Sequence, residues 1–162
     1  MRVLLLNKQA DDHPSHRELV RALAGRYPLR IYDPSLPQEP QLEGVQVVID
    51  SGGAAGTREM IDAAKAAGVR LWQATTNGLD HVDVAYFAER GLPLAHSPGP
   101  LSADPLAEHA LLMILYFAKN LHVNCASPWQ RTMNAELAGQ TLGLIGFGAS
   151  ARALAGRAGA LG

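Results

Sequence analysis

Ten residues near the end of the chain, Leu142 to Ala151, constrain the fold more than any other stretch. The apolar run Leu142–Ile145 predicts a buried strand, and it is followed at once by Gly146 and Gly148, with Ala151 at a third small position. Small residues at this spacing allow a tight turn, a close backbone approach to a pyrophosphate, and close packing of helix on strand. The free N–H groups of the following helix favour phosphate. The stretch therefore predicts the first strand and helix of a dinucleotide-binding unit, with an ordinary strand-to-helix turn as the alternative.

The sequence after this glycine turn is short. A full βαβ unit takes about 30 residues, and its ribose-binding acidic residue lies about 20 residues beyond the glycines. The sequence ends at Gly162 and has no acidic residue after Gly148. We therefore expect only the beginning of a dinucleotide-binding domain.

Composition narrows the class of protein. The chain has 162 residues, of which 48% are hydrophobic and 18% charged, as in globular domains. A formal net charge of −1 without basic runs argues against nucleic acid and against an electrostatic membrane anchor as partners. The N-terminal apolar run Val3–Leu6 is too short for a signal segment or a membrane span, so we expect a cytoplasmic location. Cys125 is the single cysteine and is expected to be a small buried hydrophobe.

Short apolar runs alternate with helical patterns over the first hundred residues. Capping residues mark the starts of three helices, at Ser15 (with Glu18), Thr57 and Asp83. Strand runs alternating with helices at this spacing predict an α/β fold with an open parallel sheet. The predicted strands are Val3–Leu6, Leu29–Tyr32, Val45–Ile49, Val69–Ala74 and Leu92–Ala95.

Polar loops follow three of these strands, at Asp50–Gly53, Thr75–Asp80 and His96–Pro100. In parallel α/β sheets, ligands bind beyond the carboxyl ends of the strands. Loops rich in Gly, Ser and Asn expose backbone N–H groups that suit a small carboxylate. Ordinary turn chemistry selects the same residues and is the alternative.

A long apolar helix is predicted from Pro105 to about Leu121, with Asp104 as its N-cap. Apolar residues surround nearly all of it, so it should be buried on most faces, by a second domain or a second subunit. We expect the segment after Gly148 to pack against this helix and to contact a further chain or domain. Residues Asn124–Ala138 are expected to form an irregular linker.

Ordered motifs connect these elements. Gly78-Leu79-Asp80-His81-Val82-Asp83 forms a GxDxxD loop, Gly91 precedes the strand and loop Leu92–Ser97, and Ala107-Glu108-His109-Ala110 forms an AEH helix segment. Trp129 and the run Glu136–Gly143 then lead into Gly146-Phe147-Gly148. In this order the motifs resemble the D-isomer-specific 2-hydroxyacid dehydrogenase family over almost the whole chain. Ala151 in place of a glycine and Ser150 in place of an aliphatic residue are small departures.

The resemblance implies a division of the chain and a function. It implies a flavodoxin-like substrate-binding domain over residues 1–100, a crossover and dimerisation helix with linker over 101–140, and the start of an NAD(P)-binding Rossmann domain over 141–162. The implied activity is hydride transfer between the nicotinamide of NAD or NADP and a small 2-hydroxy or 2-oxo acid, in a homodimer formed through helix 105–121. The family's catalytic arginine, carboxylate and histidine match no position up to residue 162, so no catalytic residue is assigned and the chain alone is expected to be inactive.

The resemblance also implies binding residues. Backbone groups at Ser51, Gly52, Asn77 and Gly78 are expected to approach the substrate carboxylate. His109, in the AEH segment, is expected to pack rather than to catalyse, and His81 to lie in a loop whose aspartates cap backbone N–H groups. No metal site is expected, since His13, His16 and His122 lack ligand spacing. The expected cofactor-binding residues are Ser102, Leu106, Gly146, Phe147, Gly148, Ala149, Ser150 and Ala151.

Two other functions remain open at this point. A non-catalytic nucleotide-sensing or interaction member of the same family fits the missing catalytic residues. A phosphoacceptor receiver domain has a similar sheet, and Asp11–Asp12, Asp50 and Thr75 or Thr76 lie near its acidic and hydroxyl positions. The receiver reading is weaker, because Asp11 lies five residues beyond Leu6 and no lysine follows Leu92–Ala95.

Overall fold

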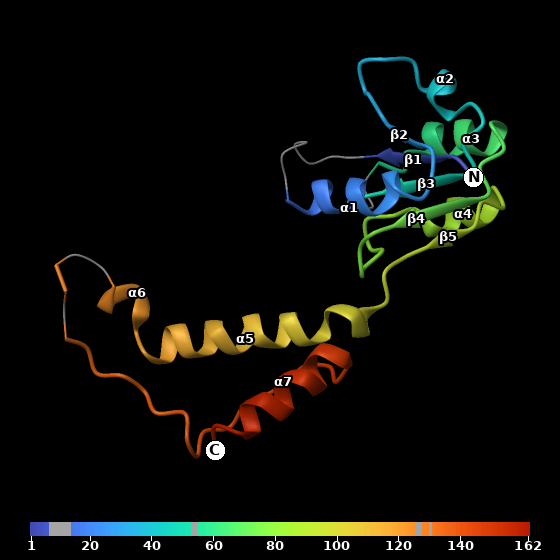
Figure 1. The fold of residues 1–162 in the computed structure, drawn as a ribbon. Coiled ribbons are helices and arrows are strands. Elements are labelled where there is room, and N and C mark those ends of the chain that lie inside the picture. The colour runs from blue at the N-terminus through green and yellow to red at the C-terminus, as the bar shows by residue number, and fades with distance from the viewer. Residues whose placement is uncertain (7–13, 53–54, 126–127, 130) are drawn as a thin grey trace. The chain divides into compact units, whose positions relative to one another are not determined.

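The structure is a computed structural model that describes residues 1–6, 14–52, 55–125, 128–129 and 131–162. The chain forms two compact units, Met1–Ser97 and Pro98–Gly162 (Figure 1). Asp11, Asp12 and His13, which entered the receiver and metal hypotheses, lie outside the described residues, as does Gly53.

The N-terminal unit is built on a five-stranded parallel sheet with strand order β2-β1-β3-β4-β5. The order is that of flavodoxin-like folds, so the predicted α/β fold class is confirmed. The strands are shorter at some ends than predicted. They are β1 (Val3–Leu6), β2 (Leu29–Ile31), β3 (Val47–Asp50), β4 (Leu71–Ala74) and β5 (Leu94–Ala95).

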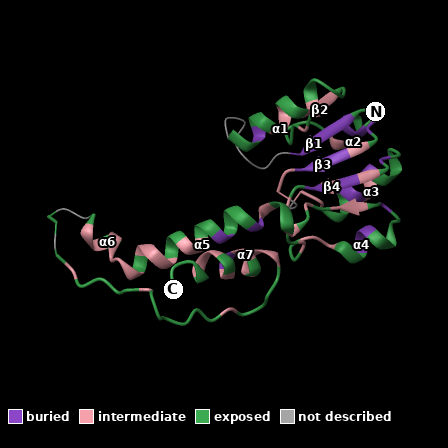
Figure 2. Cartoon of the chain, turned by 60° about the horizontal axis from the view of Figure 1, so that its bottom comes forward, coloured by how far each residue is buried: buried purple, intermediate pink, exposed green. Residues whose placement is uncertain are grey.

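Alternating side chains of the strands build a core on each face of the sheet. Leu4, Leu6 and Trp72 pack with α2 (Gln38–Leu42), α3 (Arg58–Ala66) and α4 (Val84–Glu89). Val3 and Leu5 face α1 (Pro14–Ala24) on the other side. Burial is concentrated in β1, β3 and β4, drawn purple in Figure 2. Helices on both faces explain why these strands are apolar throughout rather than alternating.

The helix caps test the local predictions. The Thr57 hydroxyl accepts a hydrogen bond from the Met60 N–H (3.3 Å), and the Asp83 carboxylate accepts one from the Tyr86 N–H (3.0 Å), so both predicted caps are confirmed. The predicted cap at Ser15 is wrong, because α1 already begins at Pro14. Proline suits the first helical position, where an N–H has no partner within the helix. The short helix α2 lies between β2 and β3, where no helix was predicted.

The C-terminal unit is helical. A 3₁₀ turn (Gly99–Ser102) leads into α5 (Ala103–Ala118), and α6 (Leu121–Asn124) and α7 (Ala149–Gly159) follow. Asp104 is therefore not the N-cap of α5, since the chain is already helical before it. Asn120, with a left-handed φ of 48°, ends the helix earlier than predicted. The predicted packing of the segment after Gly148 is confirmed, because α7 packs on α5 and Arg157 Nη2 lies 3.0 Å from Asp104 Oδ1.

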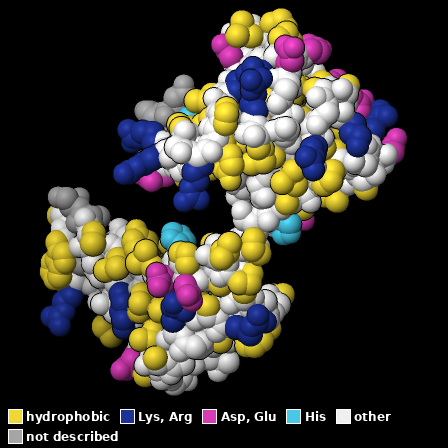
Figure 3. Space-filling view, turned by 45° about the vertical axis from the view of Figure 1, so that its right-hand side comes forward, with side chains coloured by type: hydrophobic (Ala, Val, Ile, Leu, Met, Phe, Trp, Pro, Cys, Tyr) yellow, Lys and Arg dark blue, Asp and Glu magenta, His cyan; other side chains and the backbone are white. Residues whose placement is uncertain are grey.

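Two further expectations for this unit are corrected, and a third, the burial of α5 by a second domain or subunit, stays a prediction. Residues 142–145 form no strand, because a parallel strand needs a hydrogen-bonded neighbour and the described residues supply none; Ile145 is fully exposed. Cys125 is exposed rather than buried. Within this chain α5 is buried only at Ala103 and Ala107. Apolar side chains therefore lie on the surface of this unit, where Figure 3 shows hydrophobic residues gathering.

Within the described ranges, no helix combines the length and the apolar character that a membrane span requires.

Candidate functional site

The loops that follow β3, β4 and β5 lie together at one edge of the N-terminal sheet, because parallel strands bring their carboxyl ends to the same edge. Backbone hydrogen bonds connect them. The Thr75 N–H donates to the Asp50 carbonyl (3.0 Å), and the Ser97 N–H donates to the Thr76 carbonyl (3.0 Å). The predicted substrate-binding residues Ser51, Gly52, Asn77 and Gly78 all belong to this loop cluster.

Asp50 organises the first loop. It is 1% exposed at the end of β3, and its carboxylate accepts hydrogen bonds from the N–H groups of Gly52 (3.2 Å) and Ala55 (3.1 Å). A buried carboxylate needs such partners, since an unpaired one is costly. Asp50 therefore holds the loop in shape and has no accessible oxygen to offer as a phosphoacceptor.

Three carbonyls of the turn after β4 accept hydrogen bonds from within the chain. Donors reach the carbonyl of Thr76 from the Ser97 N–H, the carbonyl of Asn77 from the His96 ring, and the carbonyl of Gly78 from the Thr76 hydroxyl (3.0 Å). The Gly78 N–H, in contrast, has no acceptor among the residues that the structure describes, and Gly78 is exposed. An exposed N–H without an internal acceptor is a donor that a small anion can use.

The N–H groups of Ser51 and Gly52 are already engaged. The Ser51 N–H donates to the Leu6 carbonyl (3.0 Å), and the Gly52 N–H donates to Asp50 Oδ1. The structure thus brings the predicted pairs Ser51–Gly52 and Asn77–Gly78 to one edge of the sheet. The N–H groups of the first pair are bonded within the chain, whereas the Gly78 N–H of the second pair is available to a ligand.

The glycine turn in the C-terminal unit combines a positive φ with an open backbone at the start of α7. Gly146 has φ +84°, which L side chains rarely adopt, and Gly148 occupies the N-cap position of α7. A Cβ placed at Gly148 would meet no atom within 4 Å, so the approach to the backbone is open. The N–H groups of Ala149, Ser150 and Ala151 lie in the first helical turn, where the helix offers them no acceptor.

Two features of this turn complete its description. Arg152 Nη1 donates to the Phe147 carbonyl (2.9 Å), which holds a positive charge beside the glycine turn. The two other predicted cofactor-binding residues lie upstream in the same unit: Ser102 immediately precedes α5, and Leu106 is 50% exposed in its first turns. The residues present therefore fit a pyrophosphate.

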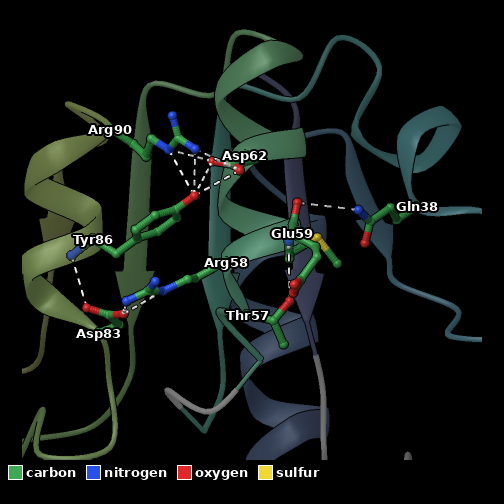
Figure 4. A network of polar contacts seen from close by, with 9 residues as sticks. Gln38, Thr57, Arg58, Glu59, Asp62, Asp83, Tyr86 and Arg90 are labelled. Atoms are coloured by element: carbon green, nitrogen blue, oxygen red, sulfur yellow. Dashed lines mark hydrogen bonds and ion pairs between the residues drawn. The ribbon is translucent and has the colours of Figure 1, made fainter.

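A polar network joins α3 to α4 behind the loop after β4 (Figure 4). Arg58 Nη2 lies 2.7 Å from Asp83 Oδ2, and Arg90 Nε lies 2.7 Å from Asp62 Oδ1. The two guanidinium groups flank the Tyr86 ring, 4.7 and 4.9 Å from its centroid. The hydrogen bond from Arg58, together with that from the Tyr86 N–H, lowers the pKa of Asp83 below its ordinary value. The network fixes the start of α4 and so the end of the loop.

Three side-chain contacts to carbonyls near these turns were not predicted from the sequence. His81 Nε2 lies 3.1 Å from the Gly52 carbonyl, His96 Nδ1 lies 2.9 Å from the Asn77 carbonyl, and Arg152 contacts Phe147. Each of these side chains contacts a backbone carbonyl, and for the two histidines that carbonyl is distant in the sequence. No spacing motif therefore marks these contacts. No group of three or more His, Cys, Asp or Glu that could hold a metal occurs within the described part of the chain.

A parallel sheet in flavodoxin-like order and a glycine turn before a helix place the chain among the α/β proteins. Sequence comparison narrows the class. Residues 3–158 match the family described as D-isomer specific 2-hydroxyacid dehydrogenase, catalytic domain. The chain belongs to this family, and the resemblance of its motifs is confirmed.

Individual relatives agree with the assignment. A hydroxypyruvate reductase of Thermotoga maritima is 28% identical over 158 residues, which cover 92% of this chain and 51% of the relative. A dehydrogenase from Rhizobium meliloti superposes with TM-score 0.76 at 24% identity, covering 98% of this chain and 56% of that structure. An NAD-dependent formate dehydrogenase from Staphylococcus aureus, solved with NAD, superposes with TM-score 0.74 at 22% identity, covering 99% of this chain and 54% of that one. The chain thus spans about half the length of these relatives.

Proposed function

We propose that this chain supplies the substrate-carboxylate loops and part of the pyrophosphate cradle of an NAD(P)-dependent oxidoreductase acting on a small 2-hydroxy or 2-oxo acid. The observation that carries the proposal is the Gly78 N–H. It is exposed, it has no acceptor among the described residues, and it lies in a turn where the carbonyls of Thr76, Asn77 and Gly78 accept hydrogen bonds. Membership in the family supports the substrate class.

The cofactor half of the proposal rests on the glycine turn. A pyrophosphate would receive hydrogen bonds from the N–H groups of Ala149 to Ala151 and the charge of Arg152, with Gly146 and Gly148 allowing the close approach. The nicotinamide supplies the hydride chemistry when NAD or NADP is bound. The chain's own residues bind and orient, and Ser102 and Leu106 are proposed to lie near the nicotinamide. No catalytic acid or base is assigned to any residue of this chain, which alone is proposed to be inactive.

The other parts of the proposal concern domains, assembly and location. We propose that residues 1–100 act as the substrate domain, 101–140 as crossover helix and linker, and 141–162 as the start of the dinucleotide-binding domain. The exposed side chains of Leu112, Met113 and Phe117 on α5 support a homodimer through helix 105–121. A cytoplasmic location stays a prediction. A non-catalytic, nucleotide-sensing role is the second candidate, and it is favoured if NADH binds while no 2-oxo acid does.

Calorimetric titration with glyoxylate, a two-carbon 2-oxo acid, tests the carboxylate site. Gly78→Pro removes the single N–H in question, whereas Gly78→Ala keeps it and asks only the flexible Asp80 side chain, 3.1 Å from the added Cβ, to move. Because hydrogen bonds to charged groups are strong, Gly78→Pro should weaken binding about tenfold or more while Gly78→Ala stays within about threefold of the wild type. Equal affinity of the two variants would contradict the proposal.

A further inference from the structure

We infer that His96 is a positioning residue for substrate binding: its ring fixes the orientation of the Asn77–Gly78 peptide, whose N–H is the proposed carboxylate donor. The inference rests on the proposed function and adds to it a residue that touches neither substrate nor cofactor. His96 lies just beyond β5, in the loop after the strand, whereas the peptide lies in the loop after β4.

A hydrogen bond joins the His96 ring to the loop after β4. His96 Nδ1 lies 2.9 Å from the Asn77 carbonyl oxygen. A carbonyl oxygen only accepts hydrogen bonds, so the ring must hold its proton on Nδ1 and donate it. The side chain is exposed, and the neighbouring Ser97 N–H donates to the Thr76 carbonyl, which keeps the two loops in register.

Peptide geometry carries the effect to Gly78. The Asn77 carbonyl and the Gly78 N–H belong to one planar peptide unit, in which the C=O and N–H bonds of the trans form point in opposite directions. Holding the oxygen on the His96 side therefore turns the Gly78 N–H away from His96. The Thr76 hydroxyl, bonded to the next carbonyl, limits rotation on the far side of Gly78.

Pre-orientation matters because binding must otherwise order the donor at the moment of contact. A glycine peptide has unusually free backbone dihedrals, so an unclamped Gly78 would sample many orientations. With His96 in place, that ordering is complete before the anion arrives. The expected effect is on affinity and not on the stability of the fold.

His81 provides a matched comparison. Its Nε2 also lies near a loop carbonyl, that of Gly52 (3.1 Å), and its side chain is also exposed. It joins neighbouring loops in the same manner but holds a different peptide. Removing it tests whether any loop-to-loop bond suffices or whether the Asn77–Gly78 peptide is the one that counts.

The test is glyoxylate affinity of the 162-residue chain, measured by calorimetry, with the NMR order parameter of the Gly78 amide as a second readout. His96→Leu and His96→Ala remove the donor, whereas His96→Asn places an amide N–H at the position of Nδ1. Loss of one hydrogen bond predicts about two- to tenfold weaker binding for Leu and Ala, with a lower order parameter for the Gly78 amide. Asn should restore both, and His81→Ala and, in the other unit, His109→Ala should leave affinity within about twofold.

The possible results distinguish a failure of the role assigned to His96 from a failure of the proposed function. Unchanged affinity and an unchanged Gly78 order parameter in His96→Leu, in a chain that binds glyoxylate, would overturn the inference and leave the proposed function standing. An Asn variant as weak as Leu, or an equal loss in His81→Ala, would reduce His96 to a general structural contact and also overturn it. Failure of the wild-type chain to bind glyoxylate would overturn the proposed function and, with it, the role of His96.

Discussion

Two apolar runs of equal length behave in opposite ways in this molecule. Val3–Leu6 forms β1, pairs with β2 and β3, and each of its side chains is at most 1% exposed. Leu142–Ile145 forms no strand, and its ends are 41% and 108% exposed. Both runs predict a strand locally, so the difference lies in neighbours. In the N-terminal unit, β1 has neighbouring strands in the sheet. The described residues of the C-terminal unit form no strand beside which residues 142–145 could pair.

Hydrogen exchange should show the largest difference between the two runs. Ladder amides of β1 open only with global unfolding, whereas amides of residues 142–145 have no ladder, so exchange should differ by at least about a thousandfold. Amides of α7 serve as the internal control that the C-terminal unit is folded. Equal protection of the two runs would break the comparison and indicate that residues 142–145 find a partner in solution.

Replacing one aromatic residue in each unit by alanine compares how well the two units bury their apolar side chains. Trp72 is 1% exposed and packs edge-on against Phe87 with ring centroids 5.4 Å apart, whereas Phe117 on α5 is 58% exposed. Trp72→Ala should lower the free energy of unfolding by about 3–5 kcal/mol. In the chain diluted below the concentration at which the proposed homodimer forms, Phe117→Ala should change it by about 0.5 kcal/mol or less. Urea unfolding followed by circular dichroism measures both, and a large loss for Phe117→Ala would mean that α5 is buried in solution.

The smallest effect concerns acid and the Arg58–Asp83 pair. Its hydrogen bonds lower the pKa of Asp83, so this carboxylate stabilises the fold above its unfolded-state pKa of about 3.9, and the contribution is lost as pH falls through the lower, folded-state value. Asp83→Asn should therefore destabilise the N-terminal unit at neutral pH and bring its stability closer to wild type in acid. Urea midpoints across this range measure the effect. Equal destabilisation of Asp83→Asn at neutral pH and in acid would reject the assignment to Asp83.

Local signals predicted what local chemistry decides. Thr57 and Asp83 cap their helices as predicted, since each side chain reaches an N–H three residues on. The fold class followed from the alternation of strands and helices. Asp104 failed as a cap because the preceding 3₁₀ turn makes the chain helical earlier, and Cys125 failed because nothing in the described part of its unit covers it.

The candidate site was partly predictable for the same reason. The loops at Ser51–Gly52 and Asn77–Gly78 carry a turn composition that the sequence displays, and the sheet brings them together. Which N–H remains available could not be predicted, because it depends on Asp50 and on the Leu6 carbonyl reaching the first loop. The contacts of His81 and His96 depend on pairing between β3, β4 and β5, which no residue spacing encodes.

We propose that the N-terminal unit binds a small carboxylate at its loop edge, with the Gly78 N–H as donor. Chemical-shift mapping of the ¹⁵N-labelled chain during a glyoxylate titration tests it most directly, with acetate as the comparison anion. The account predicts a saturable shift of the Gly78 amide and its neighbours at the loop edge, larger with glyoxylate than with acetate. Shifts confined to the C-terminal unit, or the absence of any saturable shift at Gly78, would contradict it.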